Sequence, residues 1–165
     1  MIQSVNSFIK YFGGIRKRTY RYVKAIPADQ VEWAPNENEF SCGDLVRHIT
    51  SAERMFVGVV VEGRWNYAGH EHGAQPDSLE TLIAELEATH AEMMQALSTV
   101  NDEELMQKRP TLKGHPVKAW RVLMMLVEHE VHHRSQLADY LSMMGVEPPQ
   151  IYGLGVEDVI ALAVG

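Results

Sequence analysis

The sequence lacks several features that would assign it to a familiar class of protein. Cys42 is the only cysteine among its 165 residues, so no internal disulfide forms and nothing indicates an oxidising compartment. The longest apolar run, Val122 to Val127, is far shorter than the roughly 20 residues that a membrane-spanning helix needs. The first residues do not show the charged segment and apolar stretch of a signal peptide. We therefore expect a cytoplasmic protein without a membrane partner.

Positive charge is also scarce. Lysine and arginine total 15 against 22 aspartate and glutamate residues, which gives a formal net charge of -7. Because a nucleic-acid-binding surface normally shows a basic excess, we expect no nucleic-acid partner. One basic cluster lies near the N-terminus, and we expect it to form the solvated face of a helix. It consists of Arg16, Lys17, Arg18, Arg21 and Lys24.

The alternating pattern of strands is missing, and helical periodicity takes its place. Apolar residues recur at three- and four-residue steps over about 5–25, 41–61, 77–100 and from shortly after Pro116 to Met144. Ser41 with Asp44 forms a capping-box pattern, Asp77 is the expected cap of the third helix, and Gly145 is a stop signal. Residues 108–112 and 115–118 have the pattern of a brief hairpin, and residues 156–164 that of a short closing helix. These features predict a single all-α domain, residues 1–165, built as a four-helix bundle.

Two histidines share one face of the fourth predicted helix. His129 and His133 are four residues apart, and such a step returns to within about 40° of the starting direction on a helix. The same face carries the apolar core residues, so both imidazoles are expected to point inward. His132 falls among polar residues and should face solvent. His48 lies at the edge of the inward face of the second predicted helix.

Three converging histidines favour a metal site. A single inward histidine is more often an ordinary core residue, but two unpaired imidazoles from adjacent turns are costly to bury, and a metal satisfies both. We therefore predict that His48, His129 and His133 bind a divalent ion, zinc or nickel first, with iron or manganese as alternatives. The other histidines, His70, His72, His90 and His115, are expected to be solvated.

Three further residues are candidates for catalysis by position only. Asp44 lies one turn before His48, and Gln136 follows His133 by three residues, so either can hydrogen-bond a ligand's second ring nitrogen. Capping of the second helix is an equally good interpretation of Asp44. Tyr152 is the third candidate.

A competing pattern is the string from His129 to His133, which satisfies the His-Glu-x-x-His motif of zinc metalloproteases with Glu130 as general base. Neither the glycine nor the third histidine of the metzincin motif follows, and Gln136 stands at the glycine position. The absence of strands also removes the edge along which a peptide substrate is normally extended. This interpretation is the weaker one.

Two segments carry a family resemblance: Asp44-Leu45-Val46-Arg47-His48-Ile49 and His129-Glu130-Val131-His132-His133-Arg134-Ser135-Gln136. Together they resemble the DinB-like metalloprotein superfamily, over about Val5 to Pro149. Ser135 departs from the glycine of many relatives. The resemblance implies an up-down-down-up four-helix bundle, commonly a homodimer, with a divalent metal held by His48, His129 and His133.

Members of that superfamily with assigned activities include bacillithiol and mycothiol S-transferases and a mycothiol-dependent maleylpyruvate isomerase. The resemblance therefore implies a metal-dependent thiol S-transferase or related hydrolase that acts on a small electrophile, with a low-molecular-weight thiol as co-substrate in the former case. Three neutral ligands leave a metal its full charge, which lowers the pKa of bound water or thiol. The alternative is a dimeric, stress-associated metal-binding scaffold without catalysis.

Overall fold

The computed structural model describes residues 2–67 and 78–163. Five α-helices, two 3-10 turns and one short hairpin make up these ranges. They are α1 (Val5–Lys24), η1 (Ala28–Gln30), α2 (Cys42–Glu62), α3 (Leu79–Leu97), η2 (Asp102–Met106), β1 (Lys108–Arg109), β2 (Val117–Lys118), α4 (Ala119–Met143) and α5 (Val156–Ala163). None of the helices in these ranges is both long and apolar enough to cross a membrane.

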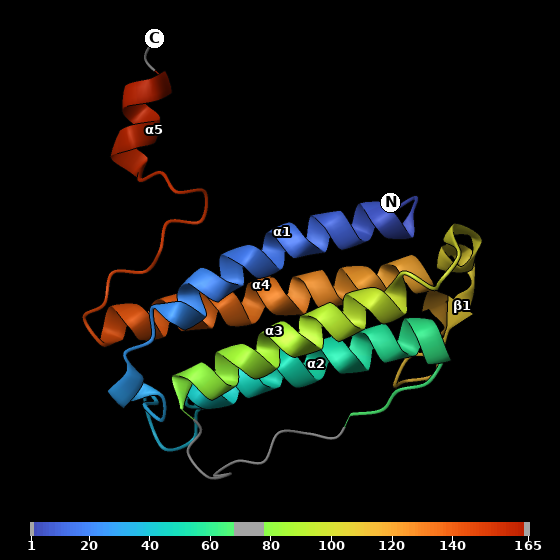
Figure 1. Ribbon diagram of the computed structural model, residues 1–165, viewed down its shortest axis with the longest axis horizontal. Coiled ribbons are helices and arrows are strands. Elements are labelled where there is room, and N and C mark those ends of the chain that lie inside the picture. The colour runs from blue at the N-terminus through green and yellow to red at the C-terminus, as the bar shows by residue number, and fades with distance from the viewer. Residues whose placement is uncertain (1, 68–77, 164–165) are drawn as a thin grey trace.

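Helices α1 to α4 form the expected bundle. Figure 1 shows α1 and α4 running in one direction and α2 and α3 in the other, which is the up-down-down-up order. Helix α2 packs against both α3 and α4, and α1 packs against α4 and α3. The hairpin predicted before the fourth helix is present but short, with Lys108 opposite Lys118 and Arg109 opposite Val117. The all-α fold class is thus confirmed.

Local signals set the ends of the helices. The Ser41 side chain accepts a hydrogen bond from the Asp44 amide, and the Asp44 carboxylate accepts one from the Ser41 amide, so the predicted capping box caps α2. Gly145 follows α4 in the left-handed conformation, with φ of 77°, as its stop signal implied. The cap of α3 is Ser78, whose side chain accepts a hydrogen bond from the Thr81 amide. The predicted cap, Asp77, lies outside the described residues.

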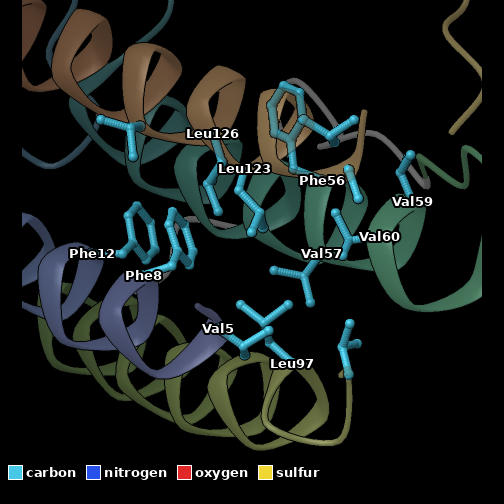
Figure 2. Packing of buried hydrophobic residues seen from close by; sticks show 14 of the residues in the cluster. Val5, Phe8, Phe12, Phe56, Val57, Val59, Val60, Leu97, Leu123 and Leu126 are labelled. Carbon is cyan, nitrogen blue, oxygen red and sulfur yellow. The ribbon is translucent and has the colours of Figure 1, made fainter. Parts of the chain in front are cut away.

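Two apolar clusters fill the bundle. The first lies toward the hairpin end, where Phe8 and Phe12 stack with ring centroids 5.6 Å apart. Figure 2 shows these rings facing Leu123 and Leu126 of α4. The second cluster lies toward the opposite end and includes Tyr22, Leu45, Leu86, Leu137 and Leu141.

A charged layer separates the two clusters and takes one residue from each bundle helix: Arg16, Glu53, His90 and Glu130. On α1, α3 and α4 the layer residue falls between residues of the first cluster and residues of the second, and on α2 Glu53 lies at the start of the first cluster's residues. Arg16 Nη2 lies 2.8 Å from Glu53 Oε2 and 2.9 Å from Glu130 Oε2, and His90 Nδ1 lies 2.8 Å from Glu53 Oε1.

This layer corrects two expectations. Arg16 is 0% exposed and belongs to the core, unlike Lys17, Arg21 and Lys24 of the same basic run, which are exposed. His90 is partly buried and paired with Glu53, not solvated. Both polar side chains are accommodated in the core because each has a carboxylate partner there.

Helix α5 forms where it was predicted but does not close the fold. Figure 1 shows it projecting away from the bundle, and its residues are exposed. The segment before it is tied to α1, because Arg21 donates hydrogen bonds to the carbonyl oxygens of Gln150 and Ile151.

Two glycine substitutions should change stability in opposite directions. Gly13 lies within α1 and an added Cβ would meet nothing within 4 Å, so Gly13→Ala should raise the free energy of unfolding by about 0.5–1 kcal/mol. Gly145→Ala meets equally open space but forces a side chain into positive φ, so it should lower that free energy by about 1–2 kcal/mol. Urea unfolding of both variants measures the difference, and shifts of the same sign would contradict it.

Candidate metal centre

The structure brings His48, His129 and His133 together between α2 and α4. Their Nε2 atoms face one another, at 2.9 Å between His48 and His129 and 3.1 Å between His129 and His133. His129 and His133 lie on adjacent turns of α4, and the antiparallel packing of α2 delivers His48 to the same point. His133 is buried, and the other two imidazoles are half-buried.

The second ring nitrogens of two of these histidines are held by neighbours. His133 Nδ1 lies 2.5 Å from Gln136 Oε1, an oxygen that can only accept, so Nδ1 carries the proton and the Nε2 lone pair is left for a metal. His48 Nδ1 lies 2.9 Å from the Tyr67 hydroxyl, which can accept in the same tautomer. Such outer contacts fix the tautomer and ring orientation of metal-binding histidines.

The His129 imidazole is neutral at physiological pH. Burial, and then the neighbouring imidazoles of His133 and His48, lower the pKa of His129 to about 3. A proton is therefore a poor bridge between these nitrogens near pH 7. A metal cation that accepts the Nε2 lone pairs of the three rings would hold these nitrogens together.

The distances fit a metal. Three nitrogens bound to one zinc ion at about 2.0–2.1 Å in tetrahedral geometry lie about 3.3 Å apart. Two of the Nε2 separations, 2.9 and 3.1 Å, differ from that value by only a few tenths of an ångström, and all three ligand nitrogens lie within 4.8 Å of one another. This donor set suits a metal held by three histidines.

Aromatic side chains surround the cluster. The ring of Phe56 lies 5.7 Å from that of His129, and the ring of Phe40 lies 5.6 Å from that of His48. Tyr67 meets the His48 ring edge-on, and Trp65 meets Phe56 in the same way. These walls lower the local dielectric and strengthen electrostatic interactions within the site.

The three candidate catalytic residues lie in different settings. Gln136 contacts a ligand histidine, as described. The Asp44 carboxylate takes part in the helix cap and lies 3.0 Å from Arg47 Nη2; burial raises its pKa, but hydrogen bonds from Arg47 and Ser41 outweigh that and hold it below the usual value. Tyr152 is 81% exposed and its ring lies 5.4 Å from the Arg18 guanidinium.

The other histidines predicted to be solvated do not join the imidazole cluster within the described residues. His132 is exposed as predicted, although its ring lies 4.8 Å from that of His133. His115 is exposed too. His70 and His72 lie outside the described residues.

Glu130 is not placed as the metalloprotease motif requires. Its side chain is 0% exposed, and its carboxylate lies against the Arg16 guanidinium in the charged layer. Burial is the main cause that raises its pKa, while Arg16 and Thr19 act to lower it. A general base must reach the reacting water, so this position argues against the protease interpretation.

Tyr67 is the site residue that the sequence did not predict. It follows α2 in a segment without periodicity, so nothing in the pattern placed its hydroxyl beside His48.

A protein-family model matches almost the whole chain. The model of the DinB family matches residues 1–160. The chain belongs to the DinB family. Among similar proteins, the uncharacterized protein YjoA of Bacillus subtilis is 28% identical over 148 residues, which cover 88% of this chain and 93% of YjoA. The uncharacterized protein YrdA of the same organism is 21% identical over 160 residues, covering 96% of this chain and 93% of YrdA.

Solved DinB-family structures share the fold. A DinB-like protein from Bacillus cereus superposes with a TM-score of 0.77 at 18% identity, covering 91% of this chain and 99% of that one. YfiT from Bacillus subtilis, described as a probable metal-dependent hydrolase with an unusual four-helix bundle topology, superposes with a TM-score of 0.68 at 13% identity, covering 87% and 89%. This chain thus shares its fold with both solved structures.

The depressed pKa of His129 predicts an acid-sensitive metal-free protein. The unfolded chain takes up this proton near pH 6.5 and the folded chain only near pH 3, so the contribution of His129 to stability is complete above pH 6.5 and is lost as the pH falls toward 3. Unfolding of chelator-treated protein between pH 7 and 4 should show a smaller loss of stability in His129→Asn than in the wild type. His132→Asn is the exposed control and should retain the wild-type slope. Equal slopes in all three proteins would contradict the assignment.

Proposed function

We propose that the protein is a divalent-metal-dependent enzyme that activates a small nucleophile against a small electrophilic substrate. The observation that carries the proposal is the convergence of the Nε2 atoms of His48, His129 and His133, with His129 Nε2 at 2.9 Å from His48 and 3.1 Å from His133. The similarity in fold to YfiT, whose description names a metal-dependent hydrolase, supports the same direction.

The residues present suit both binding and activation. A divalent ion held by three neutral imidazoles keeps its full charge and an open coordination position, and so lowers the pKa of a coordinated water or thiol toward neutrality. Gln136 holds the His133 ring in its ligating tautomer, and Tyr67 contacts the corresponding nitrogen of His48. Phe40 and Phe56 cover the rings with apolar surface, which limits competing water.

Hydrolysis and thiol transfer need the same site and differ only in the nucleophile. Hydrolysis is the first candidate because it needs no co-substrate and agrees with the description of YfiT. Transfer of a low-molecular-weight thiol is the second candidate, supported by the family resemblance in the motifs around His48 and His129. A homodimer that binds metal without catalysis is the third.

Metal content tests the binding half of the proposal. Protein prepared without an affinity tag should carry about one equivalent of zinc, nickel, iron or manganese by elemental analysis. His129→Ala should lose nearly all of it, because two imidazoles remain and the shared central nitrogen is gone. His132→Ala is the matched control from the same helix and should keep the full equivalent. A metal-free wild type, or full occupancy in His129→Ala, would refute metal binding at this cluster.

Activity assays test the catalytic half. Metal-loaded protein is mixed with a chromogenic ester, and separately with a chromogenic alkylating electrophile in the presence and absence of a small thiol. We expect turnover that falls to the uncatalysed background after chelation and returns when the metal is restored. Ester turnover alone supports a hydrolase, and strictly thiol-dependent turnover supports a transferase. Stoichiometric metal with no turnover on any substrate would favour the scaffold.

A further inference from the structure

The charged layer contacts both helices that carry the imidazole cluster. The guanidinium of Arg16, on α1, lies 2.8 Å from the carboxylate of Glu53 on α2 and 2.9 Å from that of Glu130 on α4. All three side chains are 0% exposed. One buried cation therefore bridges two helices that have no covalent connection near this point.

The bridged carboxylates lie close to the ligand histidines along both helices, α2 and α4. Glu130 directly follows His129, and about 100° of helix rotation turns its carboxylate into the core while the imidazole faces α2. Glu53 follows His48 on α2 and also faces the core. Movement of Glu130 therefore shifts the turn of α4 that carries His129, and movement of Glu53 shifts the turn of α2 that follows His48.

Stability alone does not explain this layer. Within the described residues, Nε and Nη1 of Arg16 are buried without a hydrogen-bond partner, so the guanidinium is desolvated and only partly compensated. Replacement of such buried ion pairs by neutral or apolar side chains is often neutral or stabilising. The ion pairs also restrict the relative position of two helices, because both carboxylates must stay within reach of the Arg16 guanidinium.

We propose that Arg16 is a positioning residue for the imidazole cluster. Its ion pairs with Glu53 and Glu130 fix the register and spacing of α2 against α4, and thereby hold His48 within reach of His129. The affinity readout below rests on the proposed metal site, whereas the spectroscopic readout does not.

Three variants separate positioning from support of the fold. Arg16→Met removes the bridge and leaves two buried carboxylates facing each other. The triple variant Arg16→Met/Glu53→Gln/Glu130→Gln removes the bridge without leaving that repulsion. Arg54→Met is the matched control, because Arg54 directly follows Glu53 on α2 and forms an exposed pair with Glu85 of α3, in which Arg54 Nη1 lies 3.3 Å from Glu85 Oε1.

Zinc affinity is measured by chelator competition on folded, metal-free protein, well below each variant's unfolding temperature. Arg16→Met and the triple variant should both bind zinc about tenfold to a hundredfold more weakly than the wild type. The triple variant should nevertheless unfold at the wild-type temperature or above it. Arg54→Met should match the wild type in affinity. If Arg16→Met does not fold, the triple variant decides alone, and wild-type affinity in it would overturn the proposal.

Imidazole ¹⁵N spectra of the metal-free proteins provide the independent readout. The ring signals of His48, His129 and His133 should shift or broaden in the triple variant, while those of exposed His132 stay unchanged. Unchanged signals from all three cluster histidines would overturn the proposal. If wild-type protein binds no zinc, the proposed function fails, and these spectra still decide the role of Arg16.

Discussion

The antiparallel packing of α2 against α4 is the constraint on which the rest of the molecule depends. It brings His48 to the two imidazoles of adjacent α4 turns, and on the core side of the same helices it sets Glu53 and Glu130 around Arg16. A cluster of imidazole nitrogens and a layer of buried charge both carry a desolvation cost inside a bundle. They are tolerated because the apolar clusters on either side of the charged layer anchor the same helices.

The sequence predicted what depends on helical periodicity. The bundle, the α2 capping box, the left-handed Gly145 and the convergence of three histidines all follow from which residues repeat on which face. His132 and His133 were separated correctly for the same reason, since their directions differ by about 100° and only one joins the apolar stripe. His132 is exposed and His133 is buried solely because they point in different directions from the same helix.

The features that were missed depend on partners from elsewhere in the chain. Arg16 looked like one more residue of a solvated basic run, because its two carboxylate partners lie on α2 and α4. His90 looked solvated until Glu53 was placed beside it. Tyr67 lies in a segment without repeats, and α5, though helical as expected, has no described surface of the bundle to cover it. Reaction class is harder still, since the fold shared with YfiT and the Bacillus cereus protein is common to sequences of 13–18% identity.

X-ray absorption at the metal edge of tag-free protein tests the central claim most directly, because it reports the identity and distance of the atoms bound to the ion. The account predicts a shell with three imidazole nitrogens, at about 2.0–2.1 Å for zinc, together with at least one light exchangeable ligand. A shell made of sulfur, of carboxylate oxygens, or of a single imidazole would contradict it, and would move the metal away from His48, His129 and His133.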